Sequence, residues 1–151
     1  ISGEVPEESY VVPIGSAVVR RPGNDCTIVS SSWSSVMAIE AAKLLECQGI
    51  DAELIDIRSI SPMDTNCLLS SVKKTGCLVV VDGGWRSFGA AAEISALIAE
   101  QGYNFLKAPT VRVTLPDAPA PASRELEKGY YPVAENIVSA VLETMEHRGR
   151  S

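Results

Sequence analysis

The chain has almost no histidine and no paired cysteines. Its 151 residues contain one histidine, His147, and none of the four cysteines forms a C-x-x-C pair. A zinc site of the common cysteine and histidine types is therefore excluded, and we expect no metal site. We expect His147 to lie at a solvated helix end rather than to act as a base. Each cysteine lies in an apolar segment, which favours small buried hydrophobes and a reducing compartment; they are Cys26, Cys47, Cys67 and Cys77.

Long apolar runs and basic runs are also missing. No stretch approaches the roughly 20 apolar residues of a membrane span, and the formal net charge is −6. Membranes and nucleic acids are therefore excluded as expected partners. No secretory signal opens the chain, which starts at Ile1 rather than Met, so we expect a fragment or a processed product.

The residues that are present alternate between two periodicities. Short β-branched runs predict strands at 16–21, 26–30, 51–60, 77–82 and 110–114, and helical patterns follow at 30–50, 62–74, 88–102 and 133–147. This alternation predicts an α/β domain with a mostly parallel sheet and helices on both faces. Turn residues flank the first strand, which places it at a sheet edge. In the first helix, an apolar set has helical spacing: Val36, Ile39, Leu44 and Cys47.

The segment VVVDGGWRSFGAAAEI at 79–94 has the order strand, glycines, helix of many phosphate-binding loops. Its glycines do not match G-x-G-x-x-G or a P-loop; they are Gly83, Gly84 and Gly89. An anion at the bare helix start stays open as an alternative. We favour a tight glycine turn whose aromatic residues meet another protein surface. The candidate interface residues, from this loop and from the other tryptophan loop, are Trp33, Asp82, Trp85, Arg86 and Phe88.

Other reactive combinations are absent. The serines at 30–35 lie in no G-x-S-x-G elbow. Asp56 and Asp64 flank Arg58, and we expect an ion pair or a helix cap there rather than acid–base chemistry. From the residues alone, the chain is a globular α/β domain for which no catalytic, cofactor-binding or metal-binding residue is predicted.

Four blocks in a fixed order resemble a known family. They are VPIG at 12–15, GIDAELIDIRSISPMD at 49–64, VKKTG at 72–76, and the GGW loop with the start of its helix at 83–94. Over residues 10–146 they resemble the carboxyl-terminal domain of the beta subunit of a thiamine diphosphate-dependent 2-oxoacid dehydrogenase decarboxylase component, of the pyruvate dehydrogenase type. We expect an arm at 1–13, a transketolase C-terminal-like domain at 14–148 and a tail at 149–151.

The resemblance implies a three-layer α/β/α sandwich with a five-stranded sheet whose first strand is antiparallel. It implies an intact enzyme that oxidatively decarboxylates a 2-oxo acid and acylates lipoyl groups. Thiamine diphosphate and magnesium would bind on domains outside these residues, so the fragment alone is expected to be inactive and to bind neither. Its implied partners are a second beta subunit in a homodimer, the alpha subunit and the dihydrolipoyl acyltransferase core. The implied location is the cytoplasm, or the mitochondrial matrix in a eukaryote.

The sequence departs from the family pattern at several positions. Arg86 follows the tryptophan where proline is common, Gly83 stands where a second acid is common, and Ala91 replaces a glycine. The segment at 115–132 is closer to acetoin or branched-chain relatives, so the substrate stays open. The alternatives are an acetoin or branched-chain enzyme, a transketolase-like enzyme, and a stand-alone anion- or nucleotide-binding module.

Overall fold

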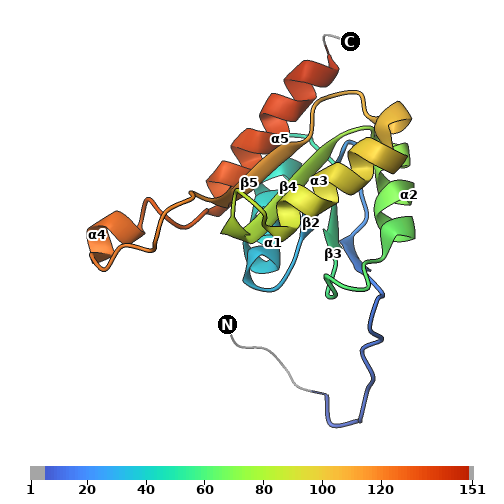
Figure 1. The fold of residues 1–151 in the computed structure, drawn as a ribbon. Coiled ribbons are helices and arrows are strands. Elements are labelled where there is room, and N and C mark those ends of the chain that lie inside the picture. Colours follow the sequence, from blue (N-terminus) through green and yellow to red (C-terminus); the bar gives the residue numbers. More distant parts are fainter. Residues whose placement is uncertain (1–5, 150–151) are drawn as a thin grey trace.

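The computed structural model describes residues 6–149 (Figure 1). Its elements, in chain order, are β1 (Val18–Arg21), β2 (Cys26–Ser30), α1 (Trp33–Glu46), β3 (Ala52–Asp56), α2 (Thr65–Thr75), β4 (Leu78–Trp85), α3 (Ala90–Gln101), the 3-10 helix η1 (Tyr103–Phe105), β5 (Val111–Leu115), α4 (Arg124–Glu127) and α5 (Ala134–Arg148). The alternation of strands and helices expected from the sequence is confirmed.

One five-stranded sheet organises the domain, in the order β1-β3-β2-β4-β5. Strands β2, β3, β4 and β5 are parallel, whereas β1 is antiparallel to β3 and forms an edge. The edge position and the reversed direction of the first strand are therefore confirmed. Because Val18 pairs with Asp56, the last residue of β3, the chain enters the sheet at the carboxyl ends of the parallel strands.

Alternating side chains of the buried strands divide the core into two layers. Ile28, Leu54 and Val79 pack with α1 and α5, and their neighbours Val29, Ile55 and Val80 pack with α2 and α3. This period of two, with both faces apolar, is the signature of a parallel sheet covered on both sides. Figure 1 shows α5 and α1 on one face and α2 and α3 on the other, which gives the three-layer sandwich.

Helix α1 does not bury the apolar set expected from its sequence. Ile39, Leu44 and Cys47 are exposed, and Val36 is only half-buried. The buried face instead consists of Ser34, Ser35, Ala38, Ala41, Ala42 and Leu45. Small residues allow the helix to approach both the sheet and α5 closely, so the larger apolar side chains point outward.

The expectation that all four cysteines are buried is wrong for two of them. Cys26 and Cys77 are fully buried, but Cys67 is half-buried and Cys47 is exposed at the end of α1. Burial raises the pKa of the Cys26 and Cys77 thiols, so both stay protonated and act as small hydrophobes.

The two carboxylates around Arg58 have structural roles. Asp64 caps α2 by accepting a hydrogen bond from the Cys67 amide at 3.1 Å, and it also accepts one from the Ala17 amide at 3.0 Å. Asp56 forms an ion pair at 3.0 Å with Arg20, not with Arg58. The expected helix cap is confirmed at Asp64, and the ion pair of Asp56 forms with Arg20 rather than with the neighbouring Arg58.

Residues 6–13 contain no helix or strand, as expected for an arm. The remaining parts of the predicted arm and tail, residues 1–5 and 150–151, lie outside the described residues. The domain boundaries stay a prediction. None of the described helices combines the length and the hydropathy that crossing a membrane requires.

Candidate interface at the carboxyl edge of the sheet

Both tryptophans lie where parallel strands end, at what we call the carboxyl edge of the sheet. Trp33 starts α1 just after β2, and Trp85 is the last residue of β4. Ligands of open α/β sheets bind outside the carboxyl ends of the strands, where the connecting loops lie. The structure thus brings the two loops selected from the sequence to one end of the molecule.

Strand β4 is longer than the sequence suggested. Residues Asp82 to Trp85 continue the strand, with an irregular register against β5 between Val81 and Trp85, and Trp85 pairs with Leu115. The expected tight turn at Gly83 and Gly84 is therefore wrong. The chain reverses at residues 86–88 instead, and all three residues of this turn are exposed.

Asp82 supports this loop from inside. One carboxylate oxygen accepts from the Gly84 amide and the other from the Ala91 amide, both at 3.0 Å. A carboxylate at the first turn of α3 satisfies amides that have no partner within the helix and interacts favourably with the helix dipole. Gly89, the N-cap, has no room for a side chain, because a Cβ would lie 2.4 Å from the Trp85 carbonyl oxygen.

This internal cap weakens the anion-binding alternative. A phosphate or diphosphate at the start of α3 would compete with the Asp82 carboxylate for the same amides and would be repelled by its charge. The residues of this loop therefore do not fit the diphosphate of thiamine diphosphate. Within residues 6–149, no three metal-ligating side chains are placed to hold an ion.

Four aromatic residues join the two tryptophan loops into what we call the aromatic row: Trp33, Tyr131, Tyr130 and Trp85. The Trp33 and Tyr131 rings meet edge to face with centroids 6.3 Å apart, and the Tyr131 and Tyr130 rings do so at 5.1 Å. The Trp85 indole donates to the Tyr130 hydroxyl at 3.4 Å, and that hydroxyl donates to the Ala118 carbonyl at 2.7 Å. Edge-to-face pairs add about 0.5–1.5 kcal/mol beyond burial, so the row is held rigid.

The tyrosines of the row, Tyr130 and Tyr131, are not among the interface candidates selected from the sequence. They follow the proline-rich segment after β5, which brings them across the sheet edge to Trp33. An aromatic pair in a loop after the carboxyl end of a strand is a signal that could have found them. Trp33, Trp85 and Tyr131 remain 39–55 % exposed, so the row presents a partly bare apolar surface.

Backbone strain is concentrated at the same edge. Among the described non-glycine residues, positive φ angles occur at Ser32, Arg58 and Phe88, which follow β2, β3 and β4. A left-handed conformation is unusual for a bulky aromatic residue, and such strain clusters at functional sites. Phe88 combines a φ of 59° with a side chain that is fully exposed.

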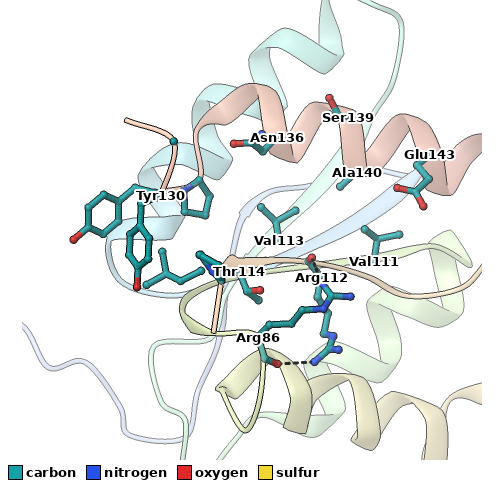
Figure 2. Close-up of a pocket in the computed structure, with 15 residues that line it drawn as sticks. Arg86, Val111, Arg112, Val113, Thr114, Tyr130, Asn136, Ser139, Ala140 and Glu143 are labelled. Atoms are coloured by element: carbon teal, nitrogen blue, oxygen red, sulfur yellow. Dashed lines mark hydrogen bonds between the residues drawn. The ribbon is translucent and has the colours of Figure 1, made fainter. Parts of the chain in front are cut away.

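The free side of β5 lines a groove of about 480 Å³ next to the aromatic row (Figure 2). Asn136, Ser139 and Glu143 of α5 form one wall, and Arg86 and Arg112 lie across from them. The two arginines hold each other's backbone, because the Arg112 guanidinium donates to the Arg86 carbonyl at 3.0 Å and the Arg86 guanidinium donates to the Arg112 carbonyl at 3.4 Å. These hydrogen bonds fix both arginines along one side of the groove.

Ser87 ties the turn to the loop after β5. Its amide and its hydroxyl donate to the two carboxylate oxygens of Asp117 at 2.9 and 2.7 Å. These hydrogen bonds, with smaller contributions from Arg86 and Arg112, hold the pKa of Asp117 below its ordinary value. Because the pKa of Asp117 is lower in the folded state, the stabilisation from the Ser87–Asp117 hydrogen bonds is fully present above about pH 4. It is lost as the pH falls through the lowered pKa.

Replacing Ser87 by alanine should raise the pKa of Asp117 toward its ordinary value, because the hydroxyl donor is lost. An NMR titration of the carboxyl carbons measures this directly. Asp51 is the internal control, since its pKa is lowered mainly by a hydrogen bond from Arg21 at a distant edge. An unchanged Asp117 titration in the variant, or an equal change at Asp51, would show that the Ser87 hydroxyl does not lower the pKa of Asp117.

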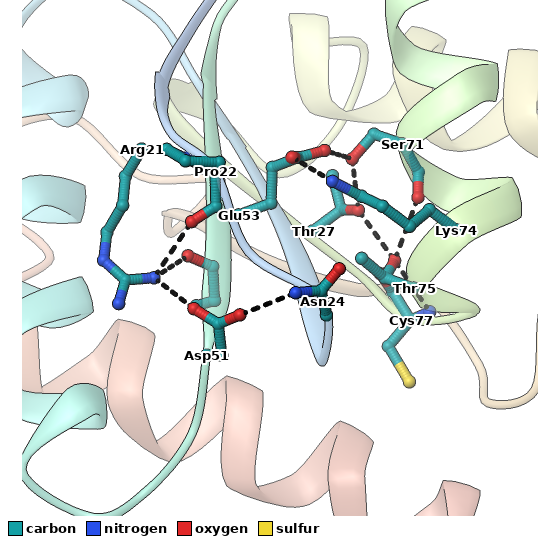
Figure 3. A network of polar contacts seen from close by, with 11 residues as sticks. Arg21, Pro22, Asn24, Thr27, Asp51, Glu53, Ser71, Lys74, Thr75 and Cys77 are labelled. Carbon is teal, nitrogen blue, oxygen red and sulfur yellow. Dashed lines mark hydrogen bonds and ion pairs between the residues drawn. The ribbon is translucent and has the colours of Figure 1, made fainter.

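A second polar cluster lies at the opposite end of the sheet and does not join the site. Glu53, Thr27, Ser71, Lys74 and Thr75 form a hydrogen-bonded network between β2, β3 and α2 (Figure 3). Among the described residues, no buried side-chain nitrogen or oxygen lacks a partner. The network has no open position for a ligand, so its role is structural.

Comparison with known proteins agrees with this architecture. The family model "Transketolase, C-terminal domain" matches residues 15–137. Over 96 % of its length, the chain is 40 % identical to acetoin:2,6-dichlorophenolindophenol oxidoreductase subunit beta of Bacillus subtilis and 41 % identical to the mitochondrial pyruvate dehydrogenase E1 component subunit beta of Mus musculus. It spans only 41–42 % of the length of these two relatives.

A solved structure described as split gene transketolase, inactive beta4 tetramer, is similar over 97 % of this chain and 46 % of its own, with a TM-score of 0.82 and 28 % identity. The family resemblance of the sequence blocks and the fold that it implies are both confirmed. The chain belongs to the transketolase C-terminal domain family.

Proposed function

We propose that this chain is the assembly domain of a beta subunit of a thiamine diphosphate-dependent 2-oxoacid dehydrogenase, the pyruvate type being favoured. The observation on which this depends is the aromatic row, a partly exposed surface at the carboxyl edge of the sheet that is made of the residue types enriched in protein interfaces. The internal cap of α3 by Asp82 supports the absence of a cofactor site within these residues. The fit of the whole chain to two fifths of the beta subunits supports the same role.

In this proposal the reaction takes place on parts of the enzyme outside this chain. Thiamine diphosphate and magnesium would bind there, and the fragment alone is inactive. The chain's own residues provide a rigid sheet, the aromatic row for the alpha subunit, and contacts to a second beta subunit. The split gene transketolase relative forms a beta4 tetramer, which supports self-association of such domains. Docking to the acyltransferase core and a cytoplasmic or matrix location follow from the same proposal.

The substrate class is the least constrained part of the proposal. Identity to the acetoin relative and to the pyruvate dehydrogenase relative is nearly equal, at 40 % and 41 %. Acetoin is therefore the second candidate substrate, with the same assembly role. A transketolase-like enzyme is less favoured, because the solved transketolase relative is only 28 % identical.

Two measurements test the proposal. Titration of the chain with thiamine diphosphate and magnesium in a calorimeter should give no saturable heat, and the alpha subunit from the same source should bind. Trp33→Ala should weaken that binding about 30-fold or more, since truncated interface tryptophans commonly cost about 2 kcal/mol or more. The matched control is Tyr103→Ala, which removes another exposed aromatic ring, in η1 at the other end of the sheet.

Saturable binding of the cofactor by these residues would contradict the proposal, as would failure to bind any alpha subunit. Equal loss of binding in the Trp33 and Tyr103 variants would reject the aromatic row as the contact surface.

A further inference from the structure

The two edges of the sheet differ in how well they are protected. The β1 edge is irregular in register, and its two arginines, Arg20 and Arg21, are held in ion pairs at 3.0 Å. An irregular register and charged side chains are common protections of an edge strand. Strand β5 lies at the other end of the strand order, and Val111 to Val113 pair with β4 in regular register. The β5 edge is therefore the one that is open to a further strand.

The free side of β5 presents backbone groups. The Leu115 carbonyl accepts a hydrogen bond from the Arg86 amide at 3.1 Å on the β4 side, and the backbone groups of successive strand residues point alternately to the two sides. The amides and carbonyls of Arg112 and Thr114 therefore point away from β4. The Arg86 guanidinium reaches the Arg112 carbonyl at 3.4 Å, which is longer than the usual range of about 2.7–3.2 Å. The amide of an added strand can replace this long hydrogen bond.

The face of the β5 edge that lies toward α5 is apolar and bears one negative charge. Val111 and Val113 pack against the core layer that contains α5, and both line the groove of about 480 Å³ (Figure 2). Ala140 and Glu143 of α5 line the groove above them. Apolar side chains of an added strand fit this face, whereas acidic ones would be repelled by Glu143.

The opposite face of the β5 edge is positive. Arg112 follows Val111 in the strand and points to this face, where Arg86 also lies (Figure 2). Neither arginine is in an ion pair with a described residue. Asp117, whose charge interacts with both, already accepts two hydrogen bonds from Ser87. The two guanidinium groups are therefore available to acidic side chains of a partner.

We propose that the free edge of β5 binds an extended segment of another protein in which apolar and acidic residues alternate. The segment adds as a sixth strand, with its apolar residues opposite Val111 and Val113 and an acidic residue opposite Arg112. Directly opposite residues of neighbouring strands share a face, so the two chemistries of this edge select that alternation. A second copy of β5 does not fit, because the arginines of both copies would meet. This inference goes beyond the proposed function and does not depend on it.

The probe is a fluorescein-labelled peptide, Glu-Val-Glu-Val-Glu-Val, titrated with the full chain and followed by fluorescence anisotropy. Binding should be saturable. Two peptides control for the charge and for the pattern: Lys-Val-Lys-Val-Lys-Val, and Glu-Glu-Glu-Val-Val-Val with the same composition but no alternation. Both should bind at least about 10-fold more weakly, since each loses favourable cross-strand pairs.

Amide hydrogen exchange locates the contact within the strand. At saturating peptide, exchange of the Arg112 and Thr114 amides should slow, because these amides gain a partner on the free side. The Val111 and Val113 amides, which point toward β4, are the internal control and should be unchanged. Slowing at none of the four amides, or equally at all of them, would overturn the inference.

Two variants test the edge and its charge separately. Thr114→Pro removes an amide from the free side only, so the Tm should stay within about 3 °C of the wild type while saturable binding is lost. Arg112→Glu should weaken the acidic peptide about 10-fold or more and should strengthen binding of the basic peptide. Lys43→Glu makes the same change of charge at an exposed position of α1 and should leave both affinities unchanged.

Normal binding by Thr114→Pro, or equal weakening by Arg112→Glu and Lys43→Glu, would reject the inference. If Thr114→Pro does not fold, Arg112→Glu and the exchange pattern decide. A change of oligomeric state in a folded Thr114→Pro variant would reject it as well, since the edge would then be occupied by a second copy. Binding of the alpha subunit is unaffected by any of these results, so the proposed function stands or falls separately.

Discussion

Replacing Gly23 by alanine is expected to lower the free energy of unfolding by about 3 kcal/mol or more. Gly23 lies buried in the turn between β1 and β2. A Cβ there would lie 2.3 Å from the Ala52 carbonyl carbon and 2.4 Å from the Glu53 nitrogen. Both atoms belong to the backbone of β3, a strand bonded on both sides, so neither can move without breaking the sheet.

The neighbouring contacts prevent the turn from moving instead. The amides of Asn24 and Asp25 both donate to the Asp51 carbonyl at 2.9 Å, and the Arg21 guanidinium donates to the Ala52 carbonyl at 2.6 Å (Figure 3). The turn is therefore attached to β3 on both sides of Gly23. For a domain of this size, the expected loss corresponds to a Tm about 6–12 °C lower.

Gly83→Ala is the matched control. A Cβ at Gly83 would meet no atom within 4 Å, and its φ is not in the left-handed region. Its thermal unfolding should match the wild type within about 0.5 kcal/mol. Similar unfolding curves for the two variants would show that the backbone of β3 can move to accept a Cβ at Gly23. The expected steric destabilisation would then be wrong.

The second large effect concerns the buried carboxylate of Glu53. Its side chain is only 5 % exposed and forms an ion pair with Lys74 of α2. The other oxygen accepts a hydrogen bond from Ser71 at 2.5 Å, and Ser71 also meets the Thr27 hydroxyl at 2.6 Å (Figure 3). Lys74 is thus the cation that balances a charge inside the sheet–helix layer, and the hydroxyls satisfy the remaining oxygen.

Lys74→Met should lower the free energy of unfolding by about 2–3 kcal/mol, measured by urea denaturation. The value lies slightly below that for a fully buried pair, because Lys74 itself is 41 % exposed and water screens it in part. Adding Glu53→Gln in the same chain should recover most of the loss, because the neutral amide keeps a hydrogen bond to Ser71 and no charge is left unpaired.

Lys73→Met controls for the removal of a helix-terminal positive charge. Lys73 is the adjacent residue, is exposed, and lies 5.6 Å from the Phe105 ring, a contact of about 0.5 kcal/mol. The two methionine variants share the same loss of charge at the end of α2. If they were equally stable, or if Glu53→Gln failed to rescue Lys74→Met, the ion pair would contribute nothing beyond the helix dipole.

The sequence alone determined the order and type of the elements, since these depend on local periodicity. The runs at 26–30 and 77–82 are rich in β-branched and apolar residues at adjacent positions, a pattern typical of strands buried on both faces. The turn residues around β1 predicted its position at a sheet edge, and Asp64 just before α2 predicted a helix cap. The structure confirms both predictions. The order of the blocks also pointed to the family that the comparison found.

Only the tertiary structure decided which faces are used. In α1 the larger apolar residues Ile39 and Leu44 are outside and the alanines are inside, because close packing against α5 and the sheet selects small side chains rather than hydrophobic ones. The extension of β4 through Gly83 and Gly84 depends on pairing with β5, about 30 residues away, which overrides the local preference of glycine for turns. The aromatic row joins residues nearly 100 positions apart. Its existence depends on where three strands end in space, which no local pattern in the sequence records.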